Sequence, residues 1–233
     1  MKSAPERLRF AGNTGHAGLS GLRAKLRRLL RSDRGSVTVE FVIIVPVMLL
    51  LMLGFTEIYM YSRAVSVVEH TAFTLADSIG QMNRVIDDNS SVATPNSLAA
   101  IWNAAALLAA PSDLQAKGGV YVTSVCDQTT KPCGAVPATP QSMAAGTPRI
   151  WWQRSAPWTD GNMRSLVTAN NILPAAWPFR NGDSAVIVEV FYQYTPFSMT
   201  APFWASAPGT QTIYQRVYVR PRYTPTLELD SAS

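Results

Sequence analysis

Hydrophobic and polar positions divide the chain into a polar head, a long apolar segment and a remainder in which short apolar runs alternate with turns. An uncharged run, Phe41–Thr56 (FVIIVPVMLLLMLGFT), has a glutamate at each end. Its sixteen residues fall short of the about 20 needed for a spanning helix. Apolar residues nevertheless continue to Tyr61 and reach back to Ser36. The segment from Ser36 to Tyr61 therefore predicts a membrane-spanning helix.

Helical periodicity continues beyond this segment, with apolar residues at three- and four-residue steps as far as Ile79. The pattern predicts one helix over residues 36–81, with its first half in lipid and its second half packed on a domain. Pro46 is expected to kink this helix or to free a carbonyl about one turn earlier. Gly80 is the expected stop.

The remainder of the chain predicts one further helix and a small sheet. Ser97 is expected to cap a helix over residues 98–109 that ends before Pro111, and residues 87–91 read as a solvated loop. Beyond residue 118, extended runs alternate with proline turns. The four runs are Val120–Cys126, Arg149–Arg154, Asp183–Tyr194 and Gln211–Arg220.

The fourth run alternates apolar and polar residues, which is typical of an antiparallel strand with one covered face, whereas the third is apolar on both sides and belongs in the centre of a sheet. The predicted fold class is α+β, a long N-terminal transmembrane helix packed on a small antiparallel sheet.

Charge changes the picture, because it is unevenly distributed. The chain has 233 residues and a formal charge of +5, yet residues 1–34 hold nine Lys/Arg against two acidic residues. The body is therefore mildly acidic, which argues against a nucleic-acid-binding domain. The basic head places the N-terminus in the cytoplasm and residues 62–233 outside it. We divide the chain into a leader (1–35), a long helix (36–81) and an extracytoplasmic α+β domain (82–233).

The sequence offers little for catalysis or for a cofactor. Two histidines and two cysteines are too few for a zinc cluster or a haem site, and neither His16 nor His70 lies in the predicted sheet. We expect no enzymatic activity, no cofactor and no metal. Cys126 and Cys133 enclose six residues, and a disulfide between them is expected in an oxidising compartment. The aromatic stretch Trp151–Trp158 either forms a carbohydrate-binding face or fills a core or subunit contact.

The junction between head and helix carries the most specific pattern. A cut after Gly35 would leave a new amine on Ser36, four residues from Glu40. In a packed bundle, the amine of one subunit could pair with the Glu40 carboxylate of a neighbour, so that two buried opposite charges compensate each other and fix the register.

These residues resemble a known family. Gly35-Ser36-Val37-Thr38-Val39-Glu40-Phe41 is similar to the processing site of class III signal peptides. Residues 45–57 (VPVMLLLMLGFTE) resemble the TadE-like proteins of the tight-adherence (Flp, type IVc) pilus system. The resemblance implies that Gly35 is the last leader residue and Ser36 the mature N-terminus. It also implies that a prepilin peptidase and the assembly machinery read Glu40, with Phe41 beside it.

The resemblance implies a pilin-like fold and the function of a minor pilin, or pseudopilin, in assembly of a tight-adherence pilus or its secretion apparatus. The implied location is the bacterial inner membrane, with the C-terminal domain periplasmic. The implied partners are a prepilin peptidase, other pilins or pseudopilins, and inner-membrane assembly proteins. Two alternatives stay open: an uncleaved, TadG-like envelope assembly protein, and a membrane-tethered carbohydrate-binding or enzymatic domain.

Overall fold

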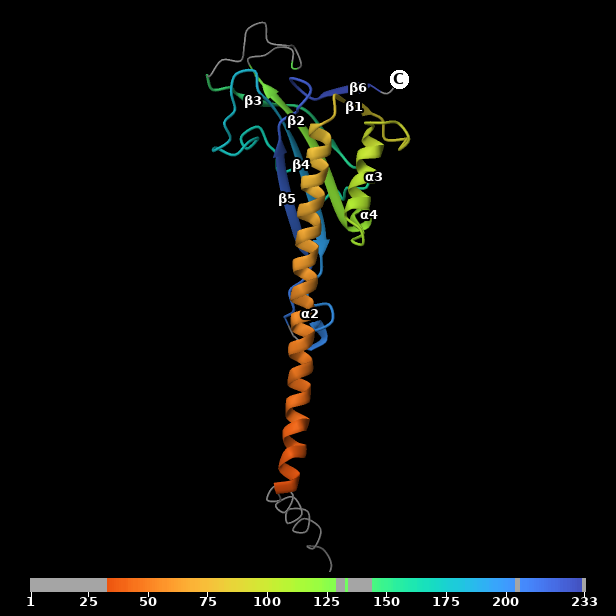
Figure 1. The fold of residues 1–233 in the computed structure, drawn as a ribbon, viewed down its shortest axis with the longest axis vertical. Coiled ribbons are helices and arrows are strands. Elements are labelled where there is room, and N and C mark those ends of the chain that lie inside the picture. The colour runs from red at the N-terminus through yellow and green to blue at the C-terminus, as the bar shows by residue number, and fades with distance from the viewer. Residues whose placement is uncertain (1–32, 129–132, 134–143, 204–205, 232–233) are drawn as a thin grey trace, which may run out of the picture. The chain divides into compact units, whose positions relative to one another are not determined.

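The structure is a computed structural model that describes residues 33–128, 133, 144–203 and 206–231, without the side chains of residues 33–36 and 203. The chain divides into two compact units, Met1–Leu53 and Gly54–Ser233. Figure 1 labels their helices and strands. The leader predicted over residues 1–35 falls almost entirely outside the described residues.

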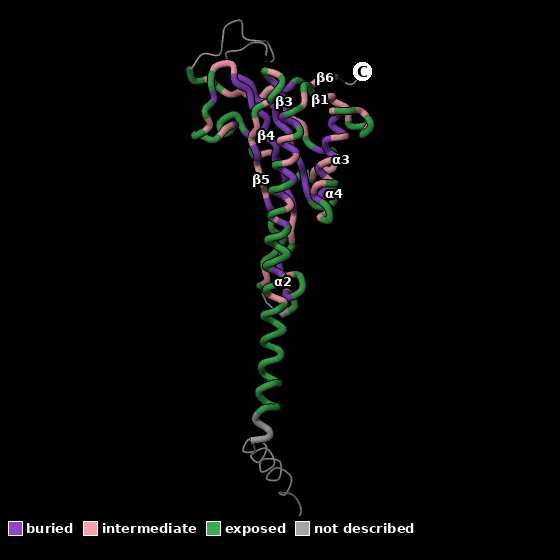
Figure 2. Tube along the Cα trace, in the orientation of Figure 1, coloured by how far each residue is buried: buried purple, intermediate pink, exposed green. Residues whose placement is uncertain are grey.

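The predicted long helix is confirmed as α2, which runs from Asp33 to Gly80 and contains 48 residues. Pro46 lies inside α2 and does not end it. In the first unit, every described side chain from Val37 to Met52 is exposed, and Figure 2 shows this stretch in green. By length and composition, α2 is the described helix able to cross a membrane. An apolar surface of this extent is expected to contact lipid or other apolar helices rather than water.

The four predicted strands are also confirmed, and they pair into one antiparallel sheet in the order β3-β2-β4-β5. Their bounds are β2 Gly118–Asp127, β3 Pro148–Ser155, β4 Ser184–Tyr194 and β5 Gln211–Val219. β4 lies between β2 and β5, so its central placement was predicted correctly. Its first nine residues are all buried, as expected for a strand covered on both faces.

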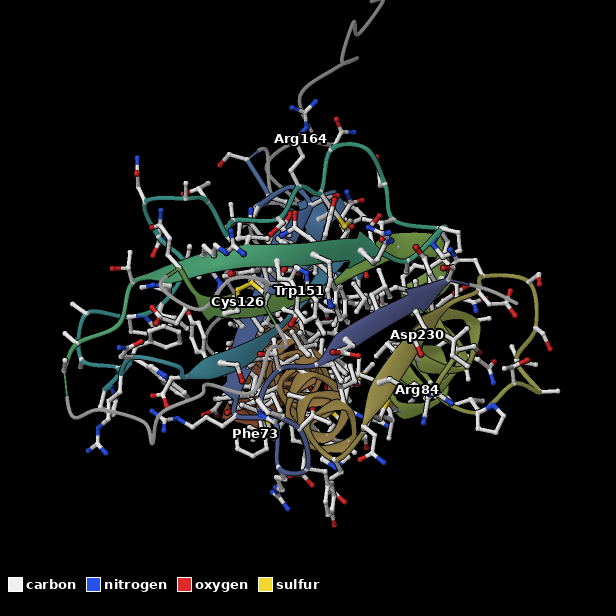
Figure 3. All side chains as sticks on the ribbon, turned by 90° about the horizontal axis from the view of Figure 1, so that it is seen from above. Phe73, Arg84, Cys126, Trp151, Arg164 and Asp230 are labelled. Atoms are coloured by element: carbon white, nitrogen blue, oxygen red, sulfur yellow. A yellow bond between two sulfur atoms is a disulfide. The ribbon has the colours of Figure 1, made fainter. Side chains whose placement is uncertain are left out.

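The second half of α2 packs against one face of this sheet within the second unit. The buried positions of α2 recur at the predicted helical spacing, and they share one apolar core with valines of β2 and β4. This core includes Ala64, Val68, Ala72, Leu75 and Ile79 of the helix and Val120, Val122, Val188 and Val190 of the sheet. Phe73 is 65% exposed, and in Figure 3 its side chain projects away from the sheet.

A close approach to β5 explains why α2 ends in glycine. A Cβ atom on Gly80 would lie 2.9 Å from Cγ2 of Val219. The Gly80 carbonyl accepts a hydrogen bond of 2.9 Å from the amide of Arg222, which satisfies one of the helix's terminal carbonyls. Gly80 therefore allows the helix to stop directly against the sheet.

Among its described residues, the second unit has three shorter helices. Helix α3, Leu98–Leu108, begins at the predicted cap, where the Ser97 hydroxyl accepts from the Ala100 amide at 3.1 Å. Helix α4 spans Leu114–Lys117, and the 3-10 helix η1 spans Ala201–Phe203.

A second, two-stranded sheet was missed by sequence analysis. β1 (Arg84–Asp87) pairs in parallel with β6 (Glu228–Ser231). Arg84 of β1 and Asp230 of β6 form a diagonal ion pair of 3.1 Å, and Figure 3 labels both. The assignment of residue 87 to a loop was therefore wrong: Asp87 ends β1 and forms a 2.6 Å ion pair with Arg154 of β3. Strands of four residues are too short for an alternating pattern to be recognised.

The other face of the four-stranded sheet is also covered, partly by the segment between β3 and β4. A second apolar cluster there joins Val167, Ile172 and Phe179 of that segment to Val125, Ala185 and Ile187 of the strands. The expectation of a single covered face on residues 211–220 was therefore wrong, because polar residues of β5 meet a buried charge on this side.

Candidate functional site

The four predicted processing residues all lie in the first part of α2. Gly35, Ser36, Glu40 and Phe41 fall within Asp33–Gly80, and the side chains of Glu40 and Phe41 are exposed. Ser36 and Glu40 are four residues apart, about one helical turn, so they lie on the same side of one helix. A pairing between the amine of one subunit and the carboxylate of another stays a prediction.

Glu57 is the residue of α2 whose environment was least expected. In the sequence it is the glutamate at the end of the uncharged run and the last residue of the segment that resembles TadE-like proteins. It is 4% exposed, and its Oε1 accepts hydrogen bonds from the backbone amides of Met199, at 2.7 Å, and Thr200, at 2.9 Å. A carboxylate bonded to amide donors is a strong charge-assisted acceptor. Glu57 therefore ties the loop between β4 and β5 to the helix.

The surroundings of Glu57 are mainly aromatic and apolar. The rings of Tyr61 and Tyr194 lie 5.7 Å apart between centroids. Burial, together with the negative charge of Glu57, raises the pKa of Tyr194. A cavity of about 290 Å³ opens beside the carboxylate, and Tyr61, Pro196, Phe197 and Pro208 are among its lining residues. The sequence shows a glutamate at the end of an apolar run and, far along the chain, an uncharged loop. Neither feature reveals that Glu57 contacts Met199 and Thr200.

A second buried carboxylate, Glu189 of β4, joins two strands and a loop. It is fully buried, and it accepts from Arg216 at 3.0 Å and from the Tyr214 hydroxyl at 2.8 Å, both on β5. The Ser165 hydroxyl and the Leu166 amide also donate to it. Every donor belongs to the same domain, so the network fixes the segment before β4 onto the sheet.

The predicted disulfide is present at one end of the sheet. Cys126, near the end of β2, is bonded to Cys133, and the described residues contain no free cysteine. The Arg149 guanidinium of β3 lies 3.0 Å from Sγ of Cys133. The bridge therefore ties Cys133 back to the end of β2, an interior strand of the sheet.

Most of the tryptophans fill cores, which favours the structural interpretation of this composition. Trp152 is 7% exposed, and its indole N–H donates to the Leu227 carbonyl at 2.9 Å. Trp151 and Trp158 are partly buried against the same core, and Trp177 packs against the second cluster. Trp204 lies outside the described residues. Across the part of the chain that is described, no three His, Cys, Asp or Glu residues gather where they could hold a metal ion.

Comparison with known proteins supports the resemblance. The family described as TadE-like protein matches residues 35–77, which begin at the predicted cleavage site and extend along α2. The suspected family is thus confirmed over this segment, and TadE-like proteins are associated with Tad pilus systems. No curated protein and no solved structure gives a match.

Proposed function

We propose that this chain is a minor pilin, or pseudopilin, that takes part in assembly of a tight-adherence pilus or its secretion apparatus. The observation that carries the proposal is the TadE-like match, which begins at Gly35 and leaves the basic leader outside. The exposed apolar surface of α2 supports it, because a subunit that assembles through helix packing must present such a surface.

The proposed topology places the N-terminus in the cytoplasm and residues 62–233 in the periplasm, with α2 anchored in the bacterial inner membrane. The nine basic residues before the apolar run support this orientation. The disulfide between Cys126 and Cys133 supports it separately, because such bonds persist in oxidising compartments.

In the proposed mechanism, a prepilin peptidase cleaves after Gly35 and creates an amine on Ser36. This amine pairs with the Glu40 carboxylate of a neighbouring pilin or pseudopilin while the apolar helices pack side by side. Each buried charge compensates the other, and a helix out of register would leave both unpaired. The sheet domain would select partners among the inner-membrane assembly proteins.

The first test is the N-terminal sequence of the protein purified from its native membrane. A start at Ser36 is expected. Gly35→Ala should block cleavage and yield a larger protein, whereas Gly54→Ala is a matched control in the same helix, since a Cβ there meets nothing within 4 Å. A start at Met1 in the unaltered protein would favour the uncleaved, TadG-like anchor instead.

The role of Glu40 is tested separately from membrane insertion. Glu40→Ala should leave the protein in the membrane fraction but reduce pilus yield, because insertion does not need the carboxylate. Glu69→Ala is the control, since Glu69 is also exposed on α2 but lies beyond the apolar run. Equal pilus yield from the two variants would contradict the pairing mechanism.

A further inference from the structure

The loop between β4 and β5 has a composition unlike that of a solvated connection. Its sixteen residues, Thr195–Thr210, contain no charged side chain, and the uncharged stretch extends from Val190 to Gln215. Met199 is 49% exposed, and Pro202 is also exposed. Apolar side chains exposed in an uncharged stretch point to a neighbour other than water.

The attachment point of the loop indicates what that neighbour is. Twenty residues counted from Phe41, about the length that crosses a bilayer, end at Met60. Glu57 comes three residues earlier, so it falls about 4.5 Å inside the end of such a span. A bare carboxylate at this depth is costly. In the structure the loop covers it: Glu57 is 4% exposed and bonded to the Met199 and Thr200 amides.

Backbone amides in this loop are hydrogen-bonded within the protein, as an environment poor in water requires. The Thr200 and Ala201 amides donate to the Phe197 carbonyl at 3.2 and 2.7 Å, and the Met199 amide donates to Glu57. Phe197 has φ of 59°, a conformation unfavourable for a residue with a side chain, yet it directs its carbonyl to these donors. Unpaired amides would be expensive next to lipid, and this turn leaves none of the three unpaired.

Residues around the turn match the chemistry of a membrane surface. Tyr59 and Tyr61 are 64% and 42% exposed, and tyrosine is enriched where a helix leaves the hydrocarbon. Arg63 and Lys117 are exposed and line one cavity of about 300 Å³ beyond this level. Two cations outside an apolar band are suited to lipid phosphates.

We propose that Thr195–Pro202, the described first part of this loop, contacts the outer interface of the bilayer, with Glu57 as the latch that holds it against α2. Met199 and its apolar neighbours contact lipid, while Arg63 and Lys117 face the phosphates. In this proposal two segments, α2 and the loop, attach the domain to the same bilayer surface. This inference rests on membrane anchoring by α2 and not on cleavage or pilus assembly.

The test uses the full chain in phosphatidylethanolamine–phosphatidylglycerol vesicles that contain spin-labelled lipids. A polarity-sensitive fluorophore is placed at Met199→Cys, at Leu49→Cys within the apolar run, and at Leu166→Cys, an exposed site on the sheet domain. The native cysteines are bonded to each other and do not compete for label. We expect strong quenching at position 49, clear quenching at 199 and none at 166.

Quenching at 49 with none at 199 would overturn the proposal while leaving the membrane anchor intact. Absence of quenching at both positions would overturn the anchor and the proposal together. The latch is tested by adding Glu57→Ala or Glu57→Gln to the labelled Met199→Cys chain. The alanine variant should lose most of the quenching at 199, and the glutamine variant, which keeps an acceptor oxygen, should retain part of it. Unchanged quenching in the alanine variant would overturn the role of Glu57.

Discussion

Replacement of Glu189 by alanine is predicted to be among the most destabilising single changes in the sheet domain. The carboxylate is 0% exposed, and its partner Arg216 has a side chain only 10% exposed. Removal of the acid leaves this guanidinium buried without its counter-charge, a change that costs about 3–5 kcal/mol. The Leu166 amide and the Tyr214 hydroxyl also lose their acceptor. We therefore expect Glu189→Ala to lower the free energy of unfolding by about 4 kcal/mol.

The assay is denaturant unfolding of the full chain in detergent, followed by tryptophan fluorescence. All six tryptophans lie beyond residue 100, so the signal reports the sheet domain rather than the apolar part of α2. The control is Asp230→Ala, which breaks the exposed pair with Arg84 and should cost less than about 1 kcal/mol. Equal effects of the two alanine substitutions would refute the reasoning, because only the Glu189 pair is buried and further hydrogen-bonded.

A double substitution separates the cost of an orphaned charge from the worth of the pair. Glu189→Leu with Arg216→Met removes both charges and keeps apolar volume, and such replacements are often neutral or stabilising. The double variant should therefore be more stable than Glu189→Ala. If the double variant is less stable than the wild type, the pair itself contributes net stability, and hydrogen bonds to Ser165 and Tyr214 are the source to examine.

Three further predictions concern the same domain. Burial, with the hydrogen bond to Glu189, raises the pKa of Tyr214 above its ordinary value of 10.0, so stability is kept below pH 10 and falls as the pH rises further. Between pH 8 and 11 the free energy of unfolding should therefore fall less in Tyr214→Phe than in the wild type, by up to about 1 kcal/mol because the ring is partly exposed. The same pH profile in both proteins would contradict this. Replacement of Cys126 and Cys133 by serine should lower the free energy of unfolding by about 2–3 kcal/mol relative to the oxidised wild type in the same assay, and reduction of the wild type should cost a similar amount. Gly118→Ala places a Cβ 2.6 Å from the Phe191 carbonyl and should cost about 1–3 kcal/mol, whereas Gly161→Ala, with nothing within 4 Å, should be neutral.

Long helices and strands were predictable from the sequence because their buried positions recur at a regular spacing. The apolar steps from Ala64 to Ile79 placed one face of α2 against a core, and the structure buries that face. Ser97 was predictable as a helix cap from local chemistry alone. β4 was recognised because a strand covered on both faces has few charged positions.

Contacts between distant segments were not predictable, because no local pattern records them. Glu189 reads as one polar residue in an apolar strand, and its pairing with Arg216 depends on the β4–β5 register, which sets these two residues opposite each other. The loop at Met199 is 142 residues from Glu57. The parallel pairing of β1 with β6 likewise joins four-residue strands that lie far apart in the chain.

The sheet domain and the apolar run of α2 differ in how their charged and apolar side chains are covered. In the described part of the second unit, both sheet faces are filled by the chain's own residues, and Glu189 is satisfied internally. The sheet therefore needs no partner to complete its core. The apolar run of α2 is different, because its described side chains, that of Glu40 among them, are exposed. A carboxylate at that position favours a neighbour that brings a positive charge, whereas exposed Leu and Ile accept any apolar surface. In the proposed assembly, the apolar side chains supply affinity for the membrane and for other helices, and the Glu40 carboxylate sets the register. Substitutions among the exposed leucines should therefore change the extent of association, and substitution of Glu40 its geometry.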